Sequence, residues 1–300
     1  MKILLFGKNG QVGWELQRSL APLGELLALD SDDKPLCGDF NDLEGIAKTV
    51  HAVAPDVIVN AAAYTAVDKA ESEPERARTI NALAPGVLAQ AAKQGNALLI
   101  HYSTDYVFDG SGEQPWLETD APTPLNVYGA TKLEGEQQIQ QSGCRHVIFR
   151  TSWVYGARGS NFAKTMLRLA QERESLTVIN DQFGAPTGAD LLADITAHAI
   201  RTVMQRPALS GLYHAAAGGV TSWHGYASFV LDFARRTGVF LEVAPDAVLP
   251  VPTSAFPTPA KRPHNSRLNT TKLQDTFDLT LPSWQTGITR MLTEILDKKS

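Results

Sequence analysis

Strand-length apolar runs alternate with helix-length amphipathic segments through the first half of this 300-residue chain. Ile3–Phe6 is apolar throughout, and Gln11–Leu23 then carries its apolar residues at helical spacing. Comparable apolar runs recur at Leu26–Leu29, Val57–Val59, Leu98–Ile100 and Val147–Phe149. Continuous apolar runs are typical of strands that are covered on both faces. The alternation predicts right-handed strand–helix–strand units and an α/β fold with a doubly wound parallel sheet.

The second half is less regular and predicts a smaller C-terminal α/β lobe. Its expected helices are Phe162–Gln171, Ala189–Met204, Gly225–Arg236 and Trp284–Leu296. Proline is frequent in residues 250–263, which fit a stiff surface loop better than a polyproline ligand for a partner protein. We expect a domain boundary near residue 155, and this boundary is approximate because the second lobe can send strands back into the first.

Composition narrows the functional class. The chain has 27 Lys and Arg against 32 Asp and Glu, a net charge of −5, whereas nucleic acid attracts dense basic patches. The sequence contains no uninterrupted run of about 18 apolar residues, the length that a membrane-spanning helix requires. Cys37 and Cys144 lie far apart and suit a reducing cytosol. We expect a cytoplasmic protein with no nucleic-acid partner and no membrane span.

A glycine-rich turn directly follows the first apolar run. Gly7, Gly10 and Gly13 stand between the first predicted strand and the first predicted helix. Free N–H groups and the helix dipole at such a turn bind a pyrophosphate, and glycines allow its close approach. The GxxGxxG spacing is one residue longer than the common fingerprint, and a plain tight turn is the alternative interpretation.

Asp30 is a second sign of a dinucleotide site. It ends the second predicted strand about 20 residues after the turn, where a carboxylate binds the adenosine ribose. An acidic residue there favours NADH because it repels a 2′-phosphate, while Lys34 leaves NADPH open. Residues 1–155 are therefore expected to form a Rossmann-type dinucleotide-binding domain, and residues 156–300 a substrate-binding lobe.

Tyr128 and Lys132 are candidate catalytic residues. Their spacing of four puts both side chains on one face of a helix. A nearby ammonium favours the phenolate, so the pair can move a proton near neutral pH. Thr104 follows the apolar run Leu98–Ile100 and is expected at the carboxyl end of a parallel strand, where such sheets bind ligands. The three residues beside a dinucleotide predict hydride transfer to or from a carbonyl carbon.

Together these features resemble the extended short-chain dehydrogenase/reductase family. The motifs of the family occur in its order over essentially the whole chain, as Gly7-x-x-Gly10-x-x-Gly13, Asn60-Ala61-Ala62-Ala63, Ser103-Thr104-Asp105 and Tyr128-x-x-x-Lys132. The segments Arg150–Gly156 and Arg262–Leu268 are most similar to the branch that reduces nucleotide-linked 4-keto-6-deoxysugars.

The resemblance implies that NADH or NADPH reduces the C4 keto group of a dTDP-linked sugar. Tyr128 would protonate the C4 oxygen, Lys132 would bind the nicotinamide ribose and tune Tyr128, and Thr104 would hold the carbonyl oxygen. The implied cofactor-binding residues are Gly7, Gly10, Gln11, Val12, Gly13, Asp30, Asp39, Phe40, Ala63, Tyr64, Thr65, Tyr128 and Lys132. The implied substrate-binding residues are Thr104, Asp105, Trp153 and Arg262, with Lys261 as an alternative to Arg262.

The resemblance further implies a homodimer, a Mg²⁺ ion and a place in the synthesis of a deoxysugar of the lipopolysaccharide O-antigen. No compact carboxylate cluster assigns ligands for the metal. The 4,6-dehydratases of the family carry Asp-Glu after the threonine, whereas this chain has Asp105-Tyr106, so elimination is not expected. Two alternatives stay open: a nucleotide-sugar 4-epimerase, which shares the three catalytic residues, and a non-catalytic nucleotide-binding regulatory subunit.

Overall fold

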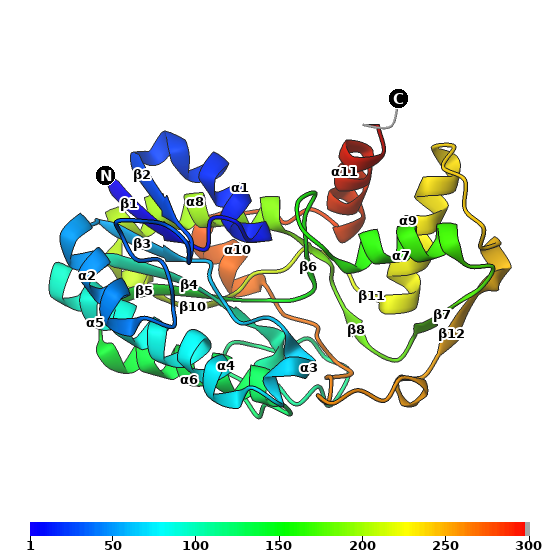
Figure 1. The fold of residues 1–300 in the computed structure, drawn as a ribbon, viewed down its shortest axis with the longest axis horizontal. Coiled ribbons are helices and arrows are strands. Elements are labelled where there is room, and N and C mark those ends of the chain that lie inside the picture. The colour runs from blue at the N-terminus through cyan, green and yellow to red at the C-terminus, as the bar shows by residue number, and fades with distance from the viewer. Residues whose placement is uncertain (298–300) are drawn as a thin grey trace.

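A six-stranded parallel sheet forms the centre of the larger of two lobes in the computed structural model, which describes residues 1–297 (Figure 1). In spatial order its strands are β10 (Gly211–His214), β5 (Arg145–Thr151), β4 (Leu98–Thr104), β3 (Val57–Asn60), β1 (Lys2–Phe6) and β2 (Glu25–Leu29). The order reverses at β1, which pairs with β2 on one side and β3 on the other. The predicted doubly wound parallel sheet is confirmed.

Side chains of the strands alternate between two hydrophobic cores. Ile3 and Leu5 pack toward α1 (Gln11–Leu20) and α8 (Ala189–Gln205) on one face of the sheet. Leu4 and Phe6 pack on the other face against α2 (Leu43–Val53) and α5 (Ala84–Gly95), beside which lies α6 (Val127–Ser142). Because both faces are covered, the strands need apolar residues at every position, which explains their continuous apolar runs.

The crossover from β3 to β4 contains α3 (Val67–Ala70), α4 (Pro74–Arg78) and α5. A π-helical turn, η2 (Thr79–Leu83), joins α4 to α5. Pro85 is the second residue of α5, which follows η2 without a break, so its missing N–H group interrupts the hydrogen-bond ladder of a continuous helix. The wider π-helical turn stands directly before the proline and accommodates this interruption.

The smaller lobe is built mainly from three helices, α7 (Phe162–Glu172), α9 (Trp223–Arg236) and α11 (Trp284–Leu296). Short strand pairs connect them, namely β6 (Val154–Tyr155) with β9 (Thr187–Gly188), β8 (Phe183–Gly184) with β11 (Thr221–Ser222), and β7 (Leu176–Ile179) with β12 (Val248–Val251). Trp153 lies where the chain leaves the sheet for this lobe, directly before β6.

Segments after residue 155 return to the larger lobe. β10 adds the edge strand beside β5, α8 packs on α1, and α10 (Thr271–Phe277) packs against β10. Before α10, the proline-rich residues 250–263 run from the smaller lobe to the junction of the two lobes, where Arg262 reaches Asp68 of α3 (Figure 1). The remaining helical turns are η1 (Ala21–Leu23), η3 (Asp105–Val107), η4 (Pro207–Leu209), η5 (Pro245–Ala247) and η6 (Thr253–Ala255).

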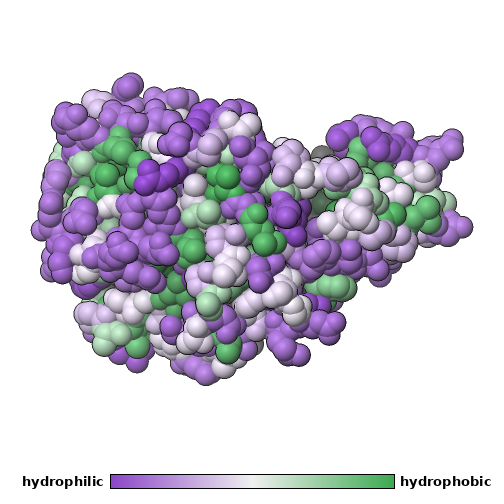
Figure 2. Space-filling view, turned by 90° about the horizontal axis from the view of Figure 1, so that it is seen from below, coloured by the Kyte–Doolittle hydropathy of each residue, from purple (hydrophilic) through white to green (hydrophobic). Residues whose placement is uncertain are grey.

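On the face drawn in Figure 2, hydrophobic residues form small groups among hydrophilic ones. Within residues 1–297, no helix has the length and apolar character that crossing a membrane requires.

Candidate active site

A cavity of about 660 Å³ opens at the carboxyl ends of the central strands, where the two lobes meet. Its sheet-side wall contains residues of the glycine turn, the segment after β3, the end of β4 and α6. Trp153 and Trp223 form the wall on the side of the smaller lobe. Open α/β sheets bind ligands at this edge, beside the strand where the order reverses.

Steric limits explain the glycines of the turn. Gly7 has φ +83°, and a Cβ atom there would lie 2.7 Å from the Ala62 backbone nitrogen. A Cβ atom at Gly13 would lie 2.0 Å from the Gly7 carbonyl oxygen. Gly10 precedes α1 and supplies no side-chain cap, so the first N–H groups of the helix are available to an anion. The glycines at 7 and 13 are thus required by close backbone packing, and the uncapped N–H groups at the start of α1 could bind an anion.

Asp30 is fixed beside the outer end of this turn. Its carboxylate accepts hydrogen bonds from the N–H groups of Asn9, at 3.0 Å, and Ser31, at 2.8 Å. Lys8 forms an ion pair with Asp33 at 2.6 Å, and Phe40 packs against Phe6 inside the core.

The segment after β3 is held by a side chain that the sequence analysis did not single out. Asn81, in the π-helical turn, accepts a hydrogen bond from the Tyr64 N–H at 2.9 Å and donates one to the Tyr64 carbonyl at 3.1 Å. Tyr64 itself is buried, and its hydroxyl donates to Glu73 at 3.0 Å. This clamp presents Ala63 and Thr65 to the cavity while Tyr64 points away from it.

Tyr128 and Lys132 stand on α6, as their spacing predicts. The helix begins where Asn126 accepts a hydrogen bond from the Gly129 N–H at 2.8 Å. A Cβ atom at Gly129 would lie 2.1 Å from the Tyr106 carbonyl oxygen, so only glycine lets the helix approach η3 this closely. The close approach brings Tyr128 and Lys132 to the same cavity as Thr104.

The acid–base groups are largely removed from water. Burial raises the pKa of Tyr128 to about 12, and a hydrogen bond with Thr104 partly opposes this rise. Burial also lowers the pKa of Lys132 to about 8. The amine donates to the Tyr102 carbonyl at 2.6 Å and lies 3.2 Å from His101 Nε2. A phenol that stays protonated at neutral pH and an amine whose pKa is lowered to about 8 therefore line the same cavity.

Several buried oxygen atoms in the cavity lack partners. The hydroxyls of Ser103 and Thr151 and the Oδ2 atom of Asp105 have no hydrogen-bond partner within residues 1–297. Burial raises the pKa of Asp105 to about 6, against hydrogen bonds with Ser266 and Thr104 that lower it. Buried polar atoms without partners are costly unless a ligand satisfies them. Together with the glycine turn, they fit a nicotinamide dinucleotide and a hydroxyl-bearing substrate.

Two tryptophans form the opposite wall. Trp153 stacks on Trp223 with ring centroids 3.7 Å apart, and its backbone has φ +49°, which is uncommon for a bulky residue. Trp223 also donates to Gln182 at 3.1 Å. Sequence reasoning missed Trp223, because its place depends on how α9 packs in the smaller lobe. The strained backbone of Trp153 beside a cavity is consistent with ligand contact.

A second cavity of about 490 Å³ continues into the smaller lobe. It shares Tyr106 and Trp223 with the first cavity and contains Phe256, Arg173 and Arg262. Arg262 is partly exposed and pairs with Asp68 of α3 at 2.7 Å, which links the two lobes. An aromatic cavity with arginines at its border suits a nucleoside diphosphate.

The structure thus divides the expected site residues into three groups. Ten of them line the first cavity: Gly10, Gln11, Val12, Ala63, Thr65, Thr104, Asp105, Tyr128, Lys132 and Trp153. Arg262 lines the second cavity. The expected residues that line neither are Gly7, Gly13, Asp30, Asp39, Phe40, Tyr64 and Lys261.

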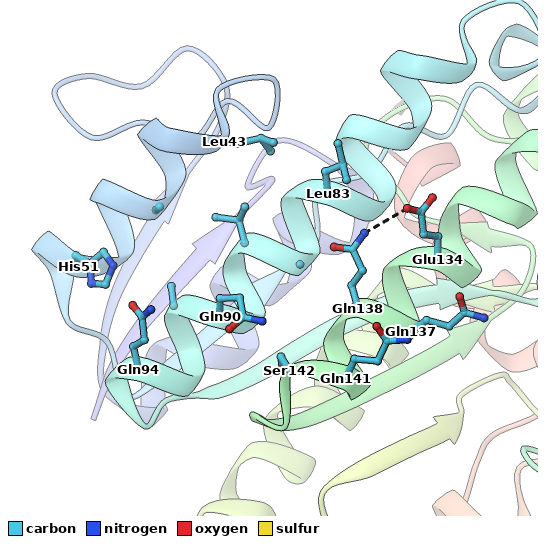
Figure 3. A pocket seen from close by; sticks show the side chains of 14 residues that line it. Leu43, His51, Leu83, Gln90, Gln94, Glu134, Gln137, Gln138, Gln141 and Ser142 are labelled. Carbon is cyan, nitrogen blue, oxygen red and sulfur yellow. Dashed lines mark hydrogen bonds between the residues drawn. The ribbon is translucent and has the colours of Figure 1, made fainter.

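A third hollow of about 780 Å³ lies outside this site, between α2, α5 and α6 (Figure 3). It is lined mostly by glutamines and small apolar residues. Gln138 donates to Glu134 at 3.3 Å, and Glu134 pairs with Arg78 at 2.7 Å. Because the carboxylate of Glu134 is already bonded to Gln138 and Arg78, we assign no chemistry to this hollow.

No group of three or more His, Cys, Asp or Glu side chains is placed to hold a metal ion in the described part of the chain. The Mg²⁺ ion that the family resemblance implies therefore has no ligand set here, and no step below uses it.

Comparison with known proteins agrees with this geometry. Residues 1–296 match the family model described as RmlD substrate binding domain. A dTDP-4-dehydrorhamnose reductase of Shigella flexneri is 63% identical over 295 residues, covering 98% of each chain. The structure of a dTDP-4-dehydrorhamnose reductase from Bacillus anthracis in complex with NADP has a TM-score of 0.86 at 35% identity, covering 98% of this chain and 99% of that one.

A UDP-glucose 4-epimerase of Thermus thermophilus in complex with NAD has a TM-score of 0.78 at 21% identity and covers 99% of each chain. This likeness shows the fold alone. With a family match that spans residues 1–296 and a relative at 63% identity, the chain belongs to the RmlD substrate-binding-domain family.

Proposed function

We propose that this protein is an oxidoreductase that reduces the C4 keto group of dTDP-4-dehydrorhamnose with NADPH or NADH, giving dTDP-L-rhamnose. The observation that carries the proposal is that Thr104, Tyr128 and Lys132 line one cavity together with the glycine turn. The identity of 63% to a dTDP-4-dehydrorhamnose reductase supports the choice of substrate.

The bound nicotinamide would supply a hydride to C4 of the sugar. The turn at Gly10, Gln11 and Val12 would hold its pyrophosphate, and Ala63 and Thr65 would contact its backbone. Asp30 would bind the adenosine ribose, with Asp39 and Phe40 near the adenine, and Gly7 and Gly13 would allow the turn its close approach to the pyrophosphate. Tyr64, which packs near Val127 and Tyr128, would support Ala63 and Thr65 from behind. The bound NADP of the Bacillus anthracis structure supports a nicotinamide dinucleotide in this place.

Thr104 lines the same cavity as Tyr128, and its hydroxyl, which donates to Asp105 Oδ1 at 3.1 Å in the free protein, would turn to donate a hydrogen bond to the C4 carbonyl oxygen. Tyr128 would then transfer its phenolic proton to that oxygen as C4 receives the hydride, so the carbonyl becomes a hydroxyl and the cofactor is oxidised. Lys132 would contact the nicotinamide ribose and tune the proton affinity of Tyr128. This step balances without a further reactant.

The substrate would span both cavities. Asp105, whose Oδ2 atom lacks a partner, would accept a hydrogen bond from a sugar hydroxyl, and Trp153 would cover the sugar. Arg262 would meet the diphosphate after exchanging its contact with Asp68. The homodimer, the cytoplasmic location and the role in O-antigen synthesis remain predictions from the family.

The proposal is tested by mixing the protein with NADPH and the 4-keto sugar nucleotide in a stopped-flow spectrophotometer and following the absorbance of reduced nicotinamide. We expect the absorbance of reduced nicotinamide to fall by one equivalent for each keto sugar consumed, and the same run with NADH measures the cofactor preference. Conversion of the sugar without net loss of reduced nicotinamide would instead identify an epimerase. Cofactor binding with no conversion of any sugar nucleotide would identify a regulatory subunit.

A further inference from the structure

Lys8 carries the one charged side chain of the glycine turn, residues 7–13. Its N–H group donates to the Leu29 carbonyl at the end of β2, at 3.2 Å, and its own carbonyl accepts a hydrogen bond from Gln17 of α1 at 2.9 Å. The backbone of Lys8 is therefore fixed between β2 and α1. Its side chain is about a quarter exposed, so the ammonium can change partner while the turn keeps its shape.

Asp33 determines where that ammonium lies in the free protein. Its Oδ2 atom lies 2.6 Å from Lys8 Nζ and also accepts a hydrogen bond from the Asp30 N–H at 2.6 Å. One carboxylate oxygen thus contacts both groups, which places the ammonium beside the backbone of Asp30. The hydrogen bond from Lys8 also lowers the pKa of the Asp33 carboxyl, so Asp33 is ionised at neutral pH.

The charges at this point bear on the choice between the two dinucleotides. The Asp30 carboxylate is held by the N–H groups of Asn9 and Ser31, in the place where an adenosine ribose is expected. NADPH differs from NADH by a phosphate on the 2′-oxygen of that ribose, which carries about two negative charges. The carboxylates of Asp30 and Asp33 would repel this phosphate, whereas a lysine ammonium binds phosphate as a point charge.

A phosphate on the ribose and the Asp33 carboxylate would compete for the same ammonium. We propose that Lys8 exchanges Asp33 for the 2′-phosphate of NADPH, and that Asp33, by holding Lys8, sets the ratio of NADPH affinity to NADH affinity. This inference rests on the proposed function in one respect, namely that the glycine turn binds a nicotinamide dinucleotide. NADH offers no phosphate at this position, so its binding leaves the pair between Lys8 and Asp33 in place.

Binding of the two dinucleotides in the absence of sugar substrate tests the exchange. Asp33→Asn keeps an oxygen that can accept from the Asp30 N–H but loses the charge that holds Lys8. In calorimetric titrations we expect this variant to bind NADPH about 5-fold more tightly than the wild-type protein, the size of one partly exposed ion pair. Its affinity for NADH should stay close to the wild-type value.

A second substitution shows whether Lys8 is the cation responsible. Lys8→Met should weaken NADPH binding about 5-fold in the wild-type background and should cancel the whole gain in the Asp33→Asn background. Lys34→Gln is the matched control, because it removes one exposed positive charge from the turn after β2 and should leave the gain intact. Competition between adenosine 2′,5′-bisphosphate and adenosine 5′-diphosphate should show the same pattern, which assigns it to the adenosine end.

Three results would overturn the exchange: a gain in Asp33→Asn that is equal for NADPH and NADH, a gain that survives Lys8→Met, or a gain that Lys34→Gln removes. Failure of the wild-type protein to bind either dinucleotide would overturn the exchange together with the proposed function. The expected binding pattern in a protein that reduces no keto sugar would support the exchange and contradict the proposed function alone. The binding titrations and the reduction assay therefore distinguish the two failures.

Discussion

The two walls of the first cavity are held in place by different means. On the sheet-side wall, Thr104 ends a central strand and Lys132 lies on a long helix, so the backbone of regular elements fixes the reacting groups. On the opposite wall, Trp153 and Trp223 are held by stacking on each other at the border of two lobes. Regular elements position atoms more precisely than aromatic packing does. We infer that the first wall determines the chemistry and the second determines which sugar is bound.

The largest expected effect concerns the first wall. Tyr128→Phe removes the proton donor and should lower turnover by about 10³-fold, while NADPH affinity changes little because the ring remains. Steady-state kinetics and fluorescence titration of NADPH measure the two quantities. Tyr213→Phe is the matched control, since that hydroxyl donates to the Leu209 carbonyl far from the cavity. A near-normal rate in Tyr128→Phe would remove the proton-donor assignment.

Asp105→Asn separates function from stability on the same wall. The pKa of Asp105 is raised to about 6 in the folded protein, so the folded state binds more protons than the unfolded one between about pH 4 and pH 6. Stability therefore falls as pH rises through this window. Asparagine removes that loss and should stabilise the free protein at pH 7 by about 1–3 kcal/mol.

The same substitution should weaken sugar-nucleotide binding, because an acceptor is lost. Denaturant unfolding at pH 4 and pH 7 measures the stability change, and KM measures binding. Unchanged stability at pH 7 together with unchanged KM would show that Asp105 is neither strained nor in contact with substrate.

Substitution on the lobe-side wall should affect binding alone. Trp223→Ala removes half of the stacked pair and should raise KM for the sugar nucleotide about 10-fold, with NADPH affinity unchanged. Trp14→Ala is the control, because Trp14 is 46% exposed on α1 and lies outside both cavities. If Trp223→Ala lowered turnover at saturating substrate as strongly as Tyr128→Phe, the division between the walls would be wrong.

The smallest effect is expected at the lobe-bridging ion pair. Arg262→Gln loses a charge that would meet the diphosphate but also frees Asp68, so KM should rise about 3-fold. Asp68→Asn should leave KM equal to or below the wild-type value, because Arg262 is then released. Opposite signs in the two variants support exchange of the arginine between Asp68 and the substrate; equal increases in KM contradict it.

The sequence predicts the sheet-side wall well. Continuous apolar runs locate β1 to β5, and motifs at their carboxyl ends meet at one edge because parallel strands share their direction. The spacing of Tyr128 and Lys132 then gives a common helix face. These features depend on neighbours along the chain or on the direction of strands.

Other features depend on contacts between distant segments and left no local signal. β10 is a short strand, Gly211–His214, that returns to the sheet from the second half of the chain. Trp223 reaches the cavity only because α9 packs in the smaller lobe. Asn60 and His101 become partners through strand register, which the apolar runs do not specify.

Transfer of deuterium is the most direct test of the proposed reaction. The protein would be incubated with the 4-keto sugar nucleotide and NADPH deuterated at both C4 positions of the nicotinamide ring, and the product examined by NMR and mass spectrometry. If the sugar is reduced by hydride transfer in the first cavity, each product molecule should carry one deuterium at C4 and one cofactor molecule should be oxidised. A product that carries no deuterium at C4, formed with the cofactor still reduced, would contradict it.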